Sequence, residues 1–175
     1  MKAARPVLIM AGGTGGHVFP ALAVAERLRE RGLPVVWMGT RRGLEATLVP
    51  KAGIPIEWIG VAGLRGKGVA RLLEMPLMLG RAVWQAGAIL RRLRPRVVLG
   101  MGGFASGPGG MVARSLGIPL VVHEQNAIAG LTNRWLARVA DRVLQAFPAT
   151  FPTARRAVTV GNPVRRPIAA LPPPA

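Results

Sequence analysis

The sequence predicts an α/β protein with a Rossmann-like, doubly wound parallel sheet of about seven strands, and three observations lead to that prediction. Short, continuously apolar runs alternate with longer stretches of helical patterning along the 175 residues. Runs of this kind are typical of strands buried on both faces, as in a parallel sheet covered by helices. Glycine-rich loops directly follow two of the runs, as at the carboxyl ends of strands that line a ligand crevice.

The expected elements follow one another along the chain. Strands are expected at Val7–Met10, Val35–Met38, Ile56–Ile59, Val97–Met101, Leu120–His123, Arg142–Gln145 and Val158–Val160. Helices are expected near residues 18–31, 44–52, 69–93, 107–116 and 129–138. Right-handed crossovers between these strands give a doubly wound sheet. We expect residues 1–166 to form one domain and residues 167–175 to be a proline-rich linker or the end of a fragment.

The composition excludes several classes of protein and leaves the partner open. The chain has no cysteine, two histidines and seven acidic residues, so we expect neither a disulfide framework nor a protein-built metal site. The net charge of +17 is compatible with nucleic acid, an anionic membrane surface or a phosphorylated substrate. The basic residues are dispersed, which weakens charge as a guide to the partner. No run reads as a spanning helix or a signal-peptide core, so we expect a cytoplasmic location.

The first glycine-rich loop, Gly12–His17, predicts a phosphate contact. Four glycines in five residues leave backbone N–H groups bare where a strand turns into a helix, and a helix amino terminus attracts anions. The loop fits neither familiar nucleotide motif. The third glycine position of the nicotinamide fingerprint holds Val18, and no acid stands among residues 39–42 after the second strand. No Gly-Lys-Ser or Gly-Lys-Thr follows a strand, as a P-loop requires.

The second glycine-rich loop, Gly102–Gly110, repeats this arrangement before a helix expected to begin near residue 107. If both loops lie at one edge of the sheet, two helix ends can hold a diphosphate between them. Close packing of helix on sheet is the alternative explanation for these glycines.

Two residues at this edge are candidates for a general base. His17 ends the first loop, and an imidazole titrates near neutral pH. Glu124 ends a buried strand, where desolvation is expected to raise its pKa and make it a better base. The sequence pattern alone does not decide whether His17 or Glu124 is the base. His123 lies inside an apolar run and is expected to be a satisfied core histidine.

The stretch from residue 69 to residue 84 is strongly apolar and is flanked by basic residues. Helical spacing predicts core packing for most of its side chains. A minority can dip into an anionic leaflet while basic neighbours contact headgroups. The preceding segment, Gly63–Gly68, is predicted to be a basic loop suited to an anionic substrate or a lipid surface.

Six segments together resemble the MurG family, the UDP-N-acetylglucosamine:undecaprenyl-diphospho-muramoyl-pentapeptide N-acetylglucosaminyltransferases. They are Ala11–Pro20, Gly63–Gly68, Gly100–Gly110, His123–Asn126, Gly130–Asn133 and Val160–Arg165. The resemblance implies one half of a GT-B enzyme, in which this domain binds the lipid-linked acceptor and an absent carboxy-terminal domain binds most of the donor. It implies transfer of N-acetylglucosamine with inversion to the muramoyl 4-hydroxyl, no cofactor, and a place at the cytoplasmic face of the inner membrane.

The resemblance also implies roles for individual residues. By this resemblance, the residues of this domain that contact UDP-N-acetylglucosamine are Thr14, Gly15, Gly16, Asn126 and Arg165. Contacts to the acceptor diphosphate fall on Gly12, Gly13, Gly102, Gly103, Ser106 and Gly107, with His17 and Glu124 supporting deprotonation. The membrane-facing surface falls on Arg65, Lys67, Arg71, Leu72, Leu73, Leu79, Arg81 and Trp84. Phe104 departs from the family, because a tyrosine is expected at its position.

The sequence does not exclude three other functions. A nicotinamide-dependent oxidoreductase is disfavoured by the departures from its fingerprint. A nucleic-acid-binding module is disfavoured because the chain has no recognition motif and few aromatic residues for stacking, so no nucleic-acid partner is expected. The chain acting alone as a membrane-surface binder is the third.

Overall fold

The computed structural model describes residues 4–60 and 69–170, with the side chains of 69–74, 167 and 169 left out. The strands are β1 (Val7–Met10), β2 (Val35–Gly39), β3 (Ile56–Trp58), β4 (Val97–Gly100), β5 (Leu120–Glu124), β6 (Arg142–Gln145) and β7 (Val158–Thr159). The helices are α1 (Gly15–Glu30), α2 (Glu45–Lys51), α3 (Val69–Leu93), α4 (Ser106–Ser115), α5 (Leu131–Leu136) and α6 (Arg166–Ala169), with a 3₁₀ turn at Thr153–Arg155.

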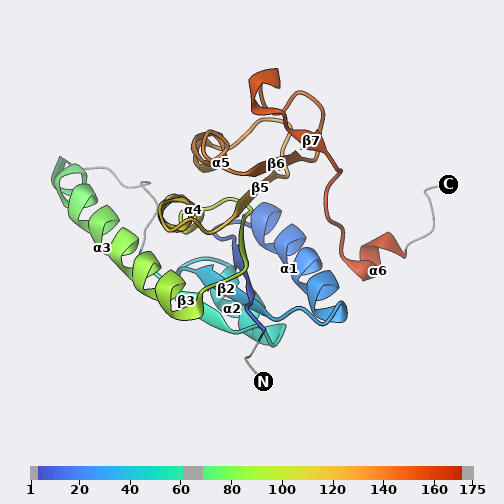
Figure 1. Ribbon diagram of the computed structural model, residues 1–175, viewed down its shortest axis with the longest axis horizontal. Helices are drawn as coiled ribbons and strands as arrows, with labels where there is room; N and C mark the ends of the chain where they lie inside the picture. The colour runs from blue at the N-terminus through green and yellow to red at the C-terminus, as the bar shows by residue number, and fades with distance from the viewer. Residues whose placement is uncertain (1–3, 61–68, 171–175) are drawn as a thin grey trace.

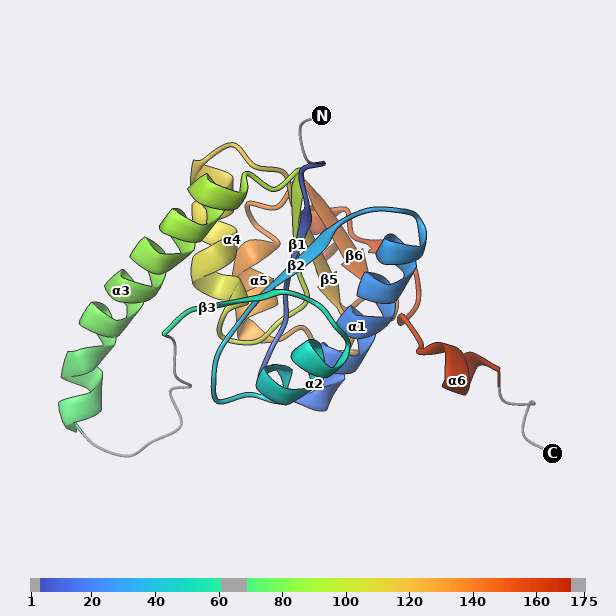
Figure 2. The ribbon, with the colours of Figure 1, turned by 90° about the horizontal axis from the view of Figure 1, so that it is seen from below.

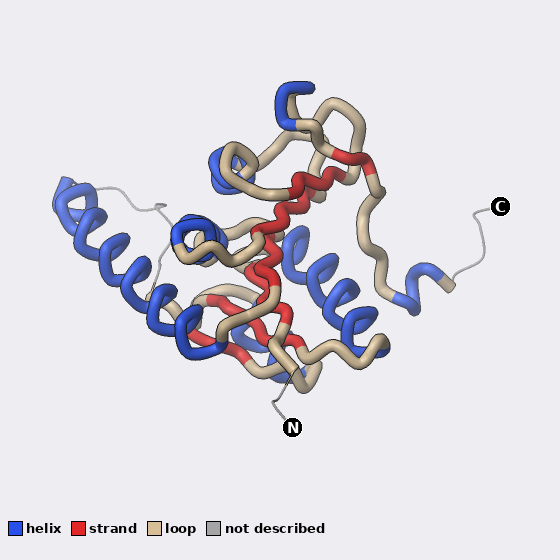
Figure 3. Tube along the Cα trace, in the orientation of Figure 1, coloured by secondary structure: helices blue, strands red, loops and turns tan. Residues whose placement is uncertain are grey.

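The seven strands form one sheet in the order β3-β2-β1-β4-β5-β6-β7, and every pairing is parallel. The predicted doubly wound sheet is therefore confirmed. Strand order reverses between β1 and β4, which pair directly, with Met10 opposite Gly100. A crevice for ligands opens at such a reversal, outside the carboxyl ends of the strands. Figure 3 shows the strands as a twisted column through the middle of the molecule.

Helices cover both faces of the sheet, as Figures 1 and 2 show. On one face, α1 and α2 bury Val18, Ala21 and Val49 against β1 and β2. On the other face, α3, α4 and α5 bury side chains such as Leu90 and Leu136 against the sheet. These apolar layers leave the strand ends as the place where polar groups gather.

Two boundaries differ from the prediction in ways that matter. Helix α1 begins at Gly15 rather than at residue 18, because the N–H groups of His17 and Val18 both donate to the carbonyl of Thr14. His17 therefore lies in the first turn of the helix. Residues 166–169, at the start of the expected linker, form the short helix α6.

Candidate functional site

The two glycine-rich loops meet at the reversal point of the sheet. A Cβ atom on Gly103 would overlap the main chain of Gly12, lying 2.8 Å from its nitrogen and closer still to its oxygen. The backbone of Gly103 has φ +87°, a conformation that residues with side chains rarely adopt. The loops are therefore in main-chain contact at one edge of the sheet.

Glu45 is a residue of this site that the sequence analysis missed. Its buried carboxylate accepts hydrogen bonds from the N–H of Gly13 at 2.9 Å, and from the N–H and hydroxyl of Thr40 at 3.0 and 2.8 Å. It thereby joins the loop after β1 to the loop after β2. The signal was an isolated acid, one of seven in a chain with 24 basic residues, directly after the second strand's loop.

His17 faces both the second loop and β5. A Cβ atom on Gly102 would lie 2.6 Å from its ring, so the missing side chain makes room for the imidazole. Its Nδ1 lies 3.0 Å from Oε1 of Gln125, the residue that follows β5. Among the described residues, none hydrogen bonds to its Nε2. His17 is half-buried, with one ring nitrogen engaged by the protein.

Glu124 corrects the expectation of a raised pKa. Its buried carboxylate accepts five hydrogen bonds, from the main chain of Gln125, Asn126 and Gly130 and from the side chains of Asn126 and Asn133. Burial alone raises the pKa of this carboxyl, but the hydrogen bonds from residues 126, 130 and 133 outweigh it and hold the pKa below its ordinary value. A carboxylate stabilised in this way is a weaker base than the sequence suggested, and it organises the loop after β5.

His123 is a satisfied core histidine, as predicted. Its side chain is buried, its Nδ1 lies 3.1 Å from Nε2 of Gln125, and its Nε2 lies 3.1 Å from the carbonyl oxygen of Gly161. Burial lowers its pKa below the ordinary value, although the bond to Gly161 and the charge of Glu124 act in the opposite direction.

Ser106 does not present its hydroxyl to the crevice, contrary to the role implied by the resemblance. The side chain is buried, and its Oγ lies 2.9 Å from the carbonyl oxygen of Met10 and 2.8 Å from that of Gly102. Its N–H donates to the carbonyl of Gly103 at 3.3 Å. Ser106 therefore fixes the second loop to β1, while the half-buried Gly107 follows in the first turn of α4.

The residues implied for the donor side lie around the start of α1 and the end of β5. Thr14, Gly16 and Asn126 are exposed, and Gly15 is half-exposed. The guanidinium of Arg165 stacks over the ring of Phe19 at 4.4 Å, which brings residue 165 to the first turns of α1. Phe104 is 43% exposed at the second loop, so its ring borders the same open edge.

The membrane-facing set is only partly described. Arg65 and Lys67, and the side chains of Arg71, Leu72 and Leu73, lie outside the described residues. Trp84 is 73% exposed, Leu79 is 48% exposed, and Arg81 is exposed on the same helix. The prediction of core packing is wrong for residues 75–84, of which only Ala82 is buried. Figure 2 shows the physical reason: this half of α3 extends past the edge of the sheet.

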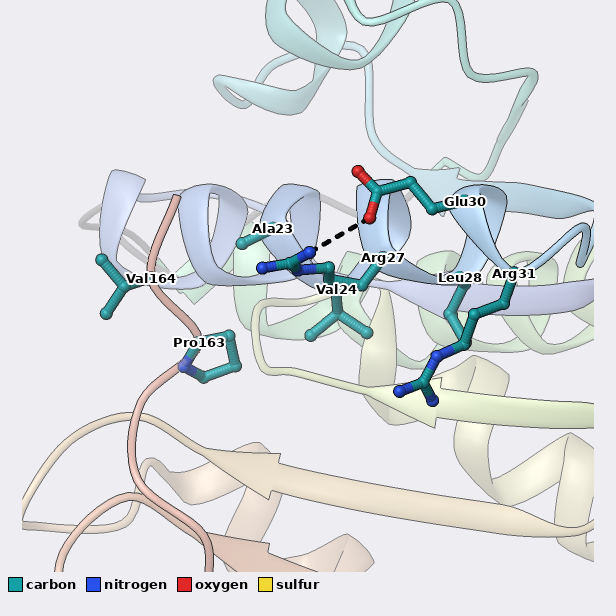
Figure 4. Close-up of a pocket in the computed structure, with 8 residues that line it drawn as sticks. All are labelled: Ala23, Val24, Arg27, Leu28, Glu30, Arg31, Pro163 and Val164. Atoms are coloured by element: carbon teal, nitrogen blue, oxygen red, sulfur yellow. Dashed lines mark hydrogen bonds and ion pairs between the residues drawn. The ribbon is translucent and has the colours of Figure 1, made fainter. Parts of the chain in front are cut away.

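Two of the hollows formed by the described residues lie away from the glycine loops. The larger, about 580 Å³, is a largely apolar groove between α1 and residues 163–164, shown in Figure 4 with the Arg27–Glu30 ion pair on its rim. The second, about 530 Å³, lies at the ends of β2 and β3 and against α3. Three arginines line it, Arg41, Arg42 and Arg81, and Arg41 stacks on Trp58 at 4.9 Å. Among the described residues, none of those lining this second hollow is acidic.

In the residues that the structure describes, no helix is both long enough and apolar enough to cross a bilayer.

A doubly wound sheet with paired glycine loops at its reversal point, and a histidine in the adjoining helix turn, defines a Rossmann-like ligand-binding domain. Residues 7–145 match the model of the glycosyltransferase family 28 N-terminal domain. The chain belongs to this family.

Individual relatives agree with the family assignment. The chain is 62% identical over 163 residues to the UDP-N-acetylglucosamine--N-acetylmuramyl-(pentapeptide) pyrophosphoryl-undecaprenol N-acetylglucosamine transferase of Methylococcus capsulatus, covering 93% of this chain and 46% of that protein. It is 65% identical over 162 residues to the protein of the same name from Nitrosococcus oceani, covering 93% and 45%. The chain thus spans about half the length of the curated relatives it matches.

Solved structures show the same fold. The crystal structure of Acinetobacter baumannii MurG superposes with a TM-score of 0.79 at 47% identity, covering 90% of this chain and 45% of that one. The UDP-GlcNAc 2-epimerase of Methanocaldococcus jannaschii has a TM-score of 0.65 at only 12% identity, covering 89% and 45%, and shows likeness of fold alone.

Proposed function

We propose that this chain is the acceptor-binding half of an N-acetylglucosaminyltransferase of peptidoglycan synthesis. Its substrates would be UDP-N-acetylglucosamine and the undecaprenyl-diphospho-muramoyl-pentapeptide. The names of its relatives supply the substrate class. A carboxy-terminal domain outside this sequence would bind most of the donor.

The main-chain contact between the two glycine loops is the observation that carries the proposal. It gathers the amino termini of α1 and α4 at one point of the sheet edge, next to His17. Helix amino termini offer N–H groups and positive partial charge to a phosphate. Gly12, Gly13, Gly102, Gly103 and Gly107 shape this cradle for the acceptor diphosphate, while the basic hollow at β2 and β3 extends a positive surface along the same edge.

The chemistry assigned to the site is a single displacement. The muramoyl 4-hydroxyl attacks C1 of N-acetylglucosamine, the bond from C1 to the UDP oxygen breaks, and a β-1,4 bond forms with inversion. His17 takes the hydroxyl proton through Nε2. Glu124 supports it indirectly by shaping the loop that carries Asn126. Thr14, Gly15, Gly16, Asn126 and Arg165 would contact the donor from this side.

A nicotinamide-dependent function has less support than this one. The acid that follows β2, Glu45, is buried and is bonded to Gly13 and Thr40 rather than facing a ribose. A dinucleotide domain of this class needs an acid that reaches the ribose hydroxyls.

Binding of a soluble acceptor analogue carrying the muramoyl diphosphate tests the proposal. We expect saturable binding by calorimetry, with NAD inert. Gly102→Ala should weaken it at least about tenfold, the equivalent of one charge-assisted hydrogen bond of about 1.5 kcal/mol, because alanine is strained at the φ of +99° and its Cβ would lie 2.6 Å from the His17 ring. Gly80→Ala, in open space on α3, is the matched control. Tight NAD binding, or the absence of analogue binding to a chain that is folded, would count against an acceptor domain.

We also propose that the exposed part of α3 contacts an anionic membrane and that the protein lies peripherally at the cytoplasmic face of the inner membrane. The observation in support is that Leu77, Leu79 and Trp84 are solvent-exposed beside Arg81. Exposed apolar side chains next to basic ones are typical of helices that lie in a bilayer interface.

Vesicle sedimentation separates insertion from charge attraction. Leu79→Glu with Trp84→Glu should weaken binding to anionic vesicles at least about tenfold, because each buried side chain contributes about 1.5–3 kcal/mol. Val158→Glu with Val160→Glu makes the same charge change at residues that are both 54% exposed elsewhere on the surface. Equal losses in the two double variants would mean that charge alone drives binding.

A further inference from the structure

A line of hydrogen bonds runs from the candidate base across the sheet edge. Nδ1 of His17 lies 3.0 Å from Oε1 of Gln125, Nε2 of Gln125 lies 3.1 Å from Nδ1 of His123, and Nε2 of His123 lies 3.1 Å from the carbonyl oxygen of Gly161. The line connects the first turn of α1, the end of β5 and the segment after β7. Gln125 and His123 are both buried, so water does not compete freely for these bonds.

The orientation of the Gln125 amide is fixed by a group that cannot donate. Its Nε2 also lies 3.0 Å from the main-chain oxygen of His123, and a carbonyl oxygen only accepts hydrogen bonds. Turning the amide over would set two oxygens against each other at this distance. The NH₂ group therefore faces His123, and the carbonyl oxygen faces His17.

The hydrogen bond from His123 to Gly161, at the other end of the line, requires the same direction of donation. The carbonyl of Gly161 also only accepts, so Nε2 of His123 carries a proton and donates to it. Burial keeps the pKa of His123 below its ordinary value, against the opposing effects of Gly161 and Glu124, so the ring is neutral and its Nδ1 holds a lone pair. That lone pair accepts from the NH₂ group of Gln125. Both ends thus agree on one direction of donation.

We propose that Gln125 is a positioning residue that holds His17 in the tautomer protonated at Nδ1. The oxygen of Gln125 can only accept, so Nδ1 of a neutral His17 must donate and Nε2 must carry the lone pair. Gln125 does for His17 what the buried carboxylate does for the histidine of a serine-protease triad, but without a charge. The catalytic consequence rests on the proposed function of His17 as the base; the tautomer itself does not.

Nitrogen NMR of the chain labelled with ¹⁵N-histidine tests this without any activity. Long-range proton–nitrogen correlations distinguish a protonated ring nitrogen from one with a lone pair. We expect the proton on Nδ1 in His17 and on Nε2 in His123, two opposite tautomers in one protein. A His17 that carries its proton on Nε2 in the wild type overturns the proposal, whether or not any variant folds.

The substitution Gln125→Met removes the acceptor while keeping the length of the side chain. We expect His17 to lose its fixed Nδ1–H form and to give the averaged signals of a ring that exchanges tautomers. Gln145→Met is the matched control, because Gln145 is also buried and hydrogen-bonded on the neighbouring strand β6 but bonds to Thr159 and Phe151 instead. An unchanged His17 tautomer in Gln125→Met would refute the positioning role.

Kinetics in a preparation that also supplies the donor-binding half separates the two proposals. Gln125→Met should lower kcat at least about tenfold with KM unchanged, because the base is misprotonated but the acceptor still binds. If the NMR result holds and His17→Ala retains activity, His17 is not the base but Gln125 still sets its tautomer. If the NMR result fails while His17→Ala is inactive, the base assignment survives and the role of Gln125 does not.

Discussion

Replacing Glu124 with glutamine is expected to lower the free energy of unfolding by about 3 kcal/mol. Its two carboxylate oxygens accept five hydrogen bonds in a fully buried site, three on Oε1 and two on Oε2. A glutamine of the same shape must turn its NH₂ group toward one of these sets of donors. A buried donor left without a partner costs about 1–3 kcal/mol, and at least two lose theirs.

Urea unfolding of the wild type and Glu124→Gln measures this difference. The matched control is Glu57→Gln, which removes an equal charge from a surface ion pair with Arg92 at 2.7 Å. Surface pairs of this kind contribute about 0–1 kcal/mol, so the control should remain close to wild type. Equal losses in both variants would contradict the scaffold role of Glu124.

The free energies of unfolding of the wild type and Glu124→Gln should also differ in their dependence on pH. The pKa of Glu124 in the folded chain lies below its ordinary value of 4.5, so its carboxylate stabilises the fold fully above that pH and loses this effect as the pH falls further. His123, whose pKa lies below 6.5, acts in the same direction from that pH downward, since the unfolded chain takes up the proton first. The acid limb of the stability curve should therefore be shallower in Glu124→Gln than in the wild type.

Gly103→Ala is expected to lower the free energy of unfolding by about 2–5 kcal/mol and to abolish binding of the acceptor analogue. The positive φ of +87° costs about 1–2 kcal/mol for any residue with a side chain. The new Cβ would in addition overlap the main chain of Gly12, and forced overlaps of this kind cost typically about 1–3 kcal/mol. Because main chain meets main chain here, no side-chain rotation relieves the contact, and the two loops must separate.

Gly32→Ala isolates the conformational part of this effect. Gly32 has φ +72°, but a Cβ atom there meets nothing within 4 Å, and the residue lies just after α1. The control should lose only about 1–2 kcal/mol and keep full binding, as measured by urea unfolding and calorimetry. If Gly103→Ala behaves like Gly32→Ala in both measurements, contact between the loops is not what forms the site.

Local sequence was sufficient to predict the architecture. The seven apolar runs became seven parallel strands with boundaries within one residue of the prediction, because strands buried on both faces need continuous apolar side chains. The two glycine-rich loops were expected at one edge of the sheet, because each follows a strand and ligands bind outside the carboxyl ends of parallel strands. The order of the strands, β3-β2-β1-β4-β5-β6-β7, came from the structure.

The fold class, the family resemblance and the place of His17 at the glycine-rich edge could be predicted from the sequence, because these depend on local pattern and spacing. Tertiary structure alone decided what each polar group does. It turned Glu124 from a candidate base into a scaffold, withdrew the Ser106 hydroxyl from the crevice and joined Glu45 to Gly13. It also left most of residues 75–84 of α3 outside the core to which helical spacing had assigned them. The physical reason is that a pKa, a tautomer and an exposed face depend on partners distant along the chain, such as residues 17, 125 and 161, which only folding brings together.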